Sequence, residues 1–241
     1  MKTYHKLIAT SLVAIGLLSF ASCTDGLDIK PTAELEDEFF DSELRLQEGV
    51  GACYASLANM YGALLNDGGG IHEILLLPGD DIANQDAGRG ALDAFAGLNS
   101  SNGQVSIIWS RLYQTIYRCN FILEKLEEPE SQTVYKTDGL QDINKGEALF
   151  LRSWCFYRLW DLFRKAPLQD KRIHSISDAI LPPSEGFQLL DKAIEDLEWA
   201  ATVLPDEEYW DLTTERGRAF NESAYGLLVK CYTLRARYNN R

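Results

Sequence analysis

The sequence is short of positive charge. Its 241 residues include 23 Lys and Arg against 36 Asp and Glu, which gives a formal net charge of −13. A general nucleic-acid binder needs a basic surface to displace counterions from phosphates, and an anionic lipid surface attracts the same kind of patch. The charge balance therefore argues against general nucleic-acid binding and against docking on an anionic membrane surface.

Metal, cofactor and catalytic patterns are also missing. The cysteines form no Cys-x-x-Cys pair, and His72 and His174, the only histidines beyond His5, have no neighbouring Cys. No zinc site is therefore indicated. No P-loop, Rossmann fingerprint or Gly-x-Ser-x-Gly elbow occurs. We expect no cofactor, no metal and no enzymatic activity.

The N-terminus has the layout of a secretory leader. A positively charged start precedes an apolar run over 7–18, which is too short to cross a bilayer as a helix. Small residues then lead to Cys23, and the segment 20–23 is similar to a bacterial lipoprotein box. We expect residues 1–22 to be removed and Cys23 to be acylated, so that lipid anchors the chain to the membrane. A plain signal peptide with a chance cysteine is the alternative.

Four further cysteines lie far apart along the chain, at Cys53, Cys119, Cys155 and Cys231. Disulfides are permitted outside the cytoplasm, so pairing stays open. Each of these cysteines nevertheless lies in an apolar pattern of helical spacing, where a free thiol behaves as a small hydrophobe. The pattern favours four buried thiols.

Apolar residues recur at helical spacing over most of the chain beyond residue 40. Residues 23–40 are polar and acidic and indicate a tether. Helices are predicted over about 41–62, 105–127, 142–165 and 184–204, and a fifth begins at Asn221 and includes Leu234, with Ser184 and Asn221 as N-caps of the last two.

The segment 63–104 is the least regular part, and its apolar run 74–77 predicts a buried strand-like piece or a short helix. No hairpin signal with flanking alternation occurs. The expected fold class is therefore all-α, a tetratricopeptide-like helical stack with long irregular loops. The helix over 142–165 is apolar nearly all round and is expected at the centre, with Glu147 and Arg152 as a structural polar pair between helices.

Four blocks of the sequence carry a family resemblance. They are LLPGDD at 76–81, WSRLYQTIYRCN at 109–120, GEALFLRSWCFYRLWDLFRKAPL at 146–168, and the elements IEDL, LP and GRA within 194–219. In order and spacing they resemble the SusD/RagB family of outer-membrane nutrient-binding lipoproteins. The resemblance implies that 41–241 is the N-terminal helical domain of a SusD-like fold. Since family members run to about twice this length, the domain is expected to be incomplete at its C-terminus.

The resemblance also implies a function without catalysis. Such a protein is a lipid-anchored, surface-exposed lipoprotein of the outer membrane that captures a glycan, or sometimes a peptide, for import by a partner TonB-dependent transporter of the SusC-like kind. In that family the loop corresponding to 80–106 contributes ligand contacts. The alternative is a tetratricopeptide-type protein-interaction lipoprotein that binds no sugar.

The loop 80–106 supplies the candidate ligand-binding residues, which are Asp81, Arg89, Phe95, Asn99 and Asn102. Carboxylates, amides and Arg match the vicinal hydroxyls of sugars, because they accept or donate two hydrogen bonds in one plane. An aromatic face packs on sugar C–H groups. Phe95 is the only aromatic residue of the loop, which weakens an assignment to starch. A polar surface loop rich in turn formers is the alternative.

Overall fold

The structure is a computed structural model, and it describes residues 39–61, 70–79, 81–84, 86–211 and 213–239. The expected leader 1–22, the acylation site Cys23 and nearly all of the tether lie outside the described residues. The helices described below belong to one compact unit, Phe40–Arg241.

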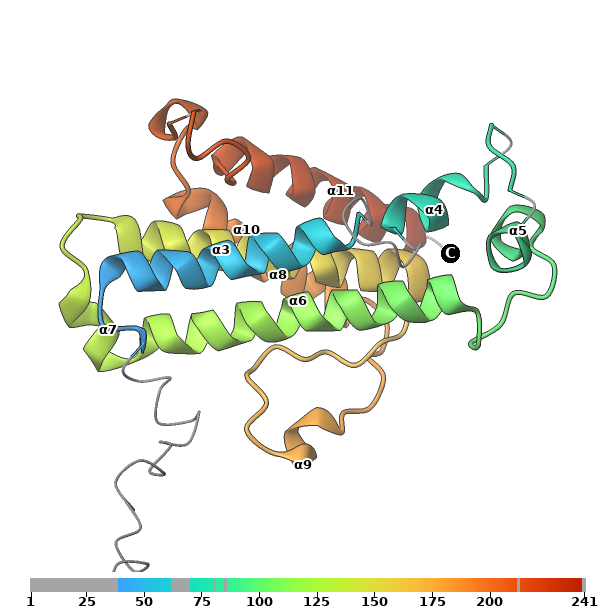
Figure 1. Ribbon diagram of the computed structural model, residues 1–241, viewed down its shortest axis with the longest axis horizontal. Helices are drawn as coiled ribbons and strands as arrows, with labels where there is room; N and C mark the ends of the chain where they lie inside the picture. The colour runs from blue at the N-terminus through green and yellow to red at the C-terminus, as the bar shows by residue number, and fades with distance from the viewer. Residues whose placement is uncertain (1–38, 62–69, 80, 85, 212, 240–241) are drawn as a thin grey trace, which may run out of the picture. The chain divides into compact units, whose positions relative to one another are not determined.

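Helices form the regular structure of this unit (Figure 1). The long ones are α3 (Glu43–Asn59), α6 (Gly103–Glu127), α8 (Leu140–Phe163), α10 (Gln188–Val203) and α11 (Asn221–Asn239). The short ones are α4 (Ile71–Leu76), α5 (Ala87–Ala94), α7 (Pro129–Val134), α9 (Ile176–Ala179) and the 3-10 turn η2 (Glu207–Tyr209). Among the described residues no strand forms, and one isolated antiparallel bridge joins Pro167 to Pro183. The all-α expectation is confirmed.

Helix α8 lies at the centre of the bundle. Helices α3, α6 and α10 pack against it, and α11 packs against α10 (Figure 1). Its side chains are buried nearly all round, as its apolar sequence predicted, and Leu151, Phe156 and Leu159 are fully buried. Complete burial of such a side chain contributes about 1.5–3 kcal/mol.

The glycine of the GEA block, Gly146, lies where two helices pack closely together. A Cβ atom at this position would lie 2.8 Å from Val203 Cγ2 and 3.3 Å from Leu204 Cδ2. Helix α8 therefore approaches the C-terminal end of α10 so closely that a side chain at this position would force Val203 to shift.

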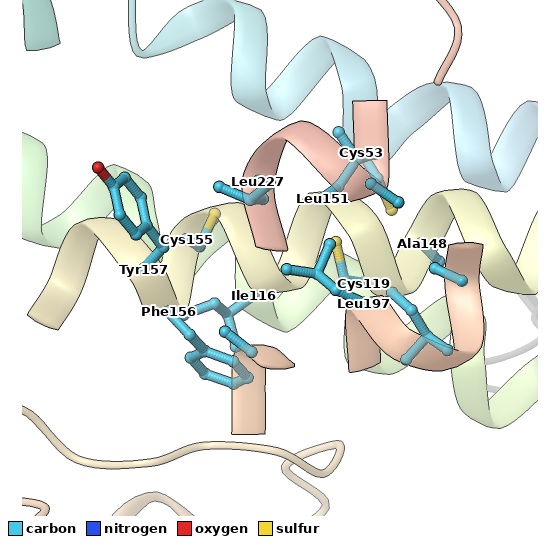
Figure 2. Packing of buried hydrophobic residues seen from close by; sticks show 14 of the residues in the cluster. Cys53, Ile116, Cys119, Ala148, Leu151, Cys155, Phe156, Tyr157, Leu197 and Leu227 are labelled. Carbon is cyan, nitrogen blue, oxygen red and sulfur yellow. The ribbon is translucent and has the colours of Figure 1, made fainter. Parts of the chain in front are cut away.

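Three of the buried cysteines, Cys53, Cys119 and Cys155, come together from different helices. Figure 2 shows Cys53 of α3, Cys119 of α6 and Cys155 of α8 in the core, and Cys231 of α11 is equally buried. All four are free thiols, as their apolar patterns predicted. Burial raises the pKa of Cys119 and Cys155 well above the ordinary thiol value, and it raises the pKa of Cys231 to about 12.

Glu147 and Arg152 of α8 both make structural polar contacts between helices, as expected, but each has its own partners. Arg152 Nε donates to Asp196 Oδ2 at 2.8 Å, and its Nη1 donates to Asn120 Oδ1 at 2.8 Å and to the Asp170 carbonyl at 2.9 Å. Three of the four blocks that carry the family resemblance thus meet at the Arg152 guanidinium, through Asn120, Arg152 itself and Asp196.

Glu147 belongs to a second polar cluster. Its Oε1 accepts from Tyr54 Oη at 2.8 Å and from Arg218 Nε at 2.9 Å. Tyr54 Oη in turn accepts from the Ala219 N–H at 2.8 Å. This cluster ties α3, α8 and the GRA element together.

Several helix boundaries differ from those expected. Helix α10 begins at Gln188 and not after Ser184, because the Ser184 N–H donates to the Ala166 carbonyl at 3.0 Å and holds that residue beside the chain that follows α8. The run 74–77 falls in α4 and the turn after it, where Leu75 and Leu76 are exposed and Leu77 is buried. Asn221, which was predicted as the N-cap, is the first residue of α11, and helix boundaries commonly differ by one or two residues between methods of assignment.

In the part of the chain that the structure describes, no helix combines the length and the apolar character needed to cross a bilayer.

Candidate ligand-binding site

A cavity of about 810 Å³ lies where the N-terminal turns of α6 meet α4, α5 and the C-terminal turn of α8. Ligand sites usually measure about 300–1,000 Å³. Figure 1 shows α4 and α5 gathered beside the start of α6. The described wall comprises Ile74, Pro78, Leu92, Phe95, Leu98, Asn99, Ser100, Val105, Ser106, Trp109, Ser110, Asp161, Leu162 and Phe163.

Two aromatic rings from different helices form one part of the wall. Trp109 of α6 and Phe163 of α8 meet edge to face, with ring centroids 4.9 Å apart and planes at 88°. The helical repeat brings Val105, Ser106 and Ser110 to the same side of α6 as Trp109. The wall therefore combines aromatic surface with hydroxyl groups.

Phe95 lies on the wall in an unusual backbone conformation. It ends α5 with φ 50° and ψ 27°, the left-handed region that few non-glycine residues adopt. Its side chain is 66% exposed. Backbone conformations of this kind cost about 1–3 kcal/mol and cluster at functional sites.

The two asparagines predicted as ligand-binding residues, Asn99 and Asn102, have different roles. Asn99 lies on the cavity wall, and its amide makes short-range bonds, accepting from the Ser101 N–H at 2.9 Å and donating to the Gly97 carbonyl at 3.1 Å. Asn102 is the N-cap of α6, because its Oδ1 accepts from the Gln104 N–H at 3.0 Å and the Val105 N–H at 3.3 Å. Its Nδ2 donates to the Gly88 carbonyl at 2.9 Å and so joins α5 to α6.

Arg89 also braces α5. Its Nε donates to Glu73 Oε1 of α4 at 3.0 Å. Asp86 caps the same helix by accepting from the Arg89 and Gly88 N–H groups, and these two bonds hold the pKa of Asp86 below its ordinary value. Arg89 and Asn102 therefore position the segment that carries Phe95.

Of the five residues predicted from the sequence, Phe95 and Asn99 lie on the cavity wall, whereas Arg89 and Asn102 are not part of the described wall. Asp81 is exposed and is not part of the wall. Ligand contact by any of the five stays a prediction.

Sequence reasoning missed Trp109, Asp161 and Phe163, because their helices were assigned to the core. The signal that could have identified them was their position near the ends of their helices. Trp109 lies near the start of its helix, next to the irregular loop, and Asp161 and Phe163 lie in the last turn of theirs. Asp161 Oδ2 accepts from Arg158 Nη1 at 3.1 Å.

A second cavity, of about 660 Å³, lies between α3 and the segment 214–218. Tyr54 and Arg218 on its wall are already bonded to Glu147 in the buried cluster that joins α3 to α8. The first cavity is therefore the better candidate for a ligand.

The chain is similar to longer proteins in both sequence and structure. A curated SusD-like protein of Formosa agariphila is 26% identical over 210 residues, which cover 83% of this chain and 38% of the relative. The crystal structure of a SusD superfamily protein from Bacteroides vulgatus matches with a TM-score of 0.67 at 26% identity, over 83% of this chain and 42% of that one. A structure named "Laminarin binding SusD-like protein" matches with a TM-score of 0.68 at 23% identity, over 82% and 41%.

The chain therefore spans 38% of the length of that curated relative. The family model described as "Starch-binding associating with outer membrane" matches residues 25–233, which is most of the sequence. As the order of the four blocks predicted, the chain belongs to the SusD-like family.

Proposed function

We propose that this chain captures a glycan, without catalysis, as part of an outer-membrane lipoprotein that serves carbohydrate uptake. The observation that carries the proposal is Phe95, whose exposed ring lies on the cavity wall although its backbone is left-handed. Core packing does not account for an exposed ring held in an unfavourable conformation. A ligand that packs on the ring accounts for both features.

The rest of the wall suits a sugar. Trp109 and Phe163 offer apolar surface for the C–H face of a pyranose ring, and Ser110 and Asn99 offer groups that both donate and accept hydrogen bonds. Trp109 adds a second aromatic residue to the one that the loop itself supplies. The name of the laminarin-binding structure and the description of the family model support a glycan as the ligand class.

The test is affinity electrophoresis of the protein through native gels that contain laminarin or amylopectin. Wild-type protein is expected to be retarded by at least one of the two, and Phe95→Ala is expected to lose most of that retardation. Tyr225→Ala is the matched control, because Tyr225 is also an exposed ring but lies outside the cavity wall. Equal retardation of wild type and Phe95→Ala would contradict the proposed site.

We propose further that Cys23 carries the lipid anchor and that the partner is a SusC-like TonB-dependent transporter. The leader pattern before Cys23 and the outer-membrane description of the family support this. The test is extraction from native outer membranes after growth with a labelled fatty acid. Wild-type protein is expected to carry the label and to co-purify with a transporter, and Cys23→Ser is expected to lose both. A labelled protein that brings no transporter would overturn the partner.

Protein interaction without sugar binding is the second candidate, because α11 exposes an apolar stripe. Tyr225, Val229 and Tyr232 follow one another at steps of four and three residues and are all exposed. Contiguous apolar surface of this kind marks interaction sites. Under this candidate Val229→Asp abolishes partner capture and Phe95→Ala has no effect, which is the reverse of the result expected for glycan capture.

A further inference from the structure

The described wall of the candidate cavity carries no positively charged side chain. Of the described residues on its wall, Asp161 is the only one with a charged side chain. The other polar groups are the amide of Asn99 and the hydroxyls of Ser100, Ser106 and Ser110. Sulfated and uronate glycans are bound through charge-assisted hydrogen bonds from Arg or Lys, and the described wall offers none.

Two arginines of the neighbouring elements, Arg158 and Arg89, are engaged elsewhere. Arg158 donates to Asp161, and its guanidinium lies 5.4 Å from the ring centroid of Trp154 and 5.1 Å from that of Tyr157. Arg89 donates to Glu73 and helps to hold α5 against α4. Neither arginine lies on the described wall, so moving one to an anionic ligand would break an existing ion pair.

Asp161 keeps one oxygen for a ligand. Its Oδ2 accepts from Arg158, whereas its Oδ1 has no hydrogen bond to any described residue. A free carboxylate oxygen accepts a hydrogen bond from a sugar hydroxyl, and it repels a sulfate or carboxylate in the same place. The net charge of −13 adds to that repulsion over a longer range.

We propose that this cavity selects electrically neutral glycans and rejects glycans that carry sulfate or carboxylate groups, with Asp161 as the residue that discriminates. The inference rests on the proposed glycan binding and names the ligand class of that same site. Discrimination against a wrong ligand commonly depends on such a repulsive element.

The test uses pairs of polymers that share a backbone and differ in charge. Laminarin is compared with laminarin sulfate, and hydroxyethyl cellulose with carboxymethyl cellulose, by affinity electrophoresis at low and at moderate salt. Wild-type protein is expected to bind the neutral member at least tenfold more tightly than the anionic member of the same pair. The ratio of neutral to anionic affinity is expected to fall as salt screens the repulsion.

Two variants separate the charge of Asp161 from its shape. Asp161→Asn keeps an oxygen for Arg158 and removes the negative charge, so it is expected to reduce the ratio of neutral to anionic affinity severalfold. Ser110→Lys places a cation on the wall at an exposed helical position and is expected to create binding to the anionic member. Circular dichroism of both variants checks that the helical fold is retained.

The outcomes are distinguishable. If wild-type protein binds the anionic member as tightly as the neutral one, or if Asp161→Asn leaves the ratio unchanged, the selectivity is overturned and glycan binding stands. If no polymer of either charge is bound, glycan binding itself is overturned, and the selectivity falls with it.

Discussion

The buried centre around Arg152 and the cavity beside Phe95 use polar side chains in opposite ways. At the centre, Arg152 and Asp196 have side chains only 7% and 3% exposed, and Arg152 bonds to residues that are 32 and 44 positions away in sequence. At the cavity, Asn99 and Asn102 accept from backbone N–H groups two or three residues away. The centre depends on long-range partners for stability, whereas the cavity segment keeps its local shape largely by itself and leaves its rings exposed.

Asp196→Ala gives the largest expected effect, because it removes the carboxylate and leaves the Arg152 guanidinium charged and buried. Breaking a buried ion pair from one side costs about 3–5 kcal/mol. Urea denaturation followed by circular dichroism measures the loss in the free energy of unfolding.

Glu185→Ala is the control, since the Lys165–Glu185 pair is an exposed ion pair of similar length. Exposed pairs contribute about 0–1 kcal/mol. If both variants lost the same small amount, the centre would not be the main site of polar stabilisation.

A pH series tests the buried thiols next. Burial raises the pKa of Cys231 from 9.0 to about 12, so the unfolded chain releases this proton at a lower pH than the folded chain does. The stabilisation is complete below pH 9 and is lost between pH 9 and pH 12, at about 1.4 kcal/mol per pH unit for one thiol.

Cys231→Ala is therefore expected to reduce the slope of unfolding free energy against pH by about that amount over this range, as measured by urea denaturation at each pH. Ser177→Ala, at an exposed position on α9, serves as the control and should leave the slope unchanged. An unchanged slope in Cys231→Ala would show that this thiol ionises equally in both states.

Phe95→Asn tests the cavity side of the comparison. Asn adopts the left-handed conformation more readily than Phe does, so the free energy of unfolding is expected to rise by up to about 1 kcal/mol. Glycan affinity is expected to fall about tenfold, because the ring is lost. Urea denaturation and affinity electrophoresis measure the two quantities on the same protein, and a loss of stability would mean that the ring packs the fold instead of a ligand.

The sequence was informative where one helical repeat continued for many residues. The central place of α8 and the burial of Cys155 followed from the nearly unbroken apolar character of this helix. The partners of Glu147 and Arg152 could not be found in this way, because they lie on other elements and only the fold brings them together. Only some residues of the cavity wall could be predicted from the sequence. Loop composition indicated Phe95 and Asn99, but Trp109 and Asp161 have the same periodicity as core residues and are told apart only by where their helices end.

The smallest expected effects come from the two asparagines, which divide the roles of structure and site within one loop. Asn102→Ala removes the N-cap of α6 and the bond to Gly88, so it is expected to lower the free energy of unfolding by about 1 kcal/mol. Asn102→Ser keeps a capping oxygen and is expected to recover most of that loss. Asn99→Ala is expected to leave stability within about 0.5 kcal/mol of wild type and to weaken glycan retardation instead, because Asn99 is exposed and lies on the cavity wall. Urea denaturation and affinity electrophoresis of the three variants decide the matter. Loss of stability in Asn99→Ala with unchanged retardation would show that the loop is structural throughout and that its ligand contacts lie elsewhere.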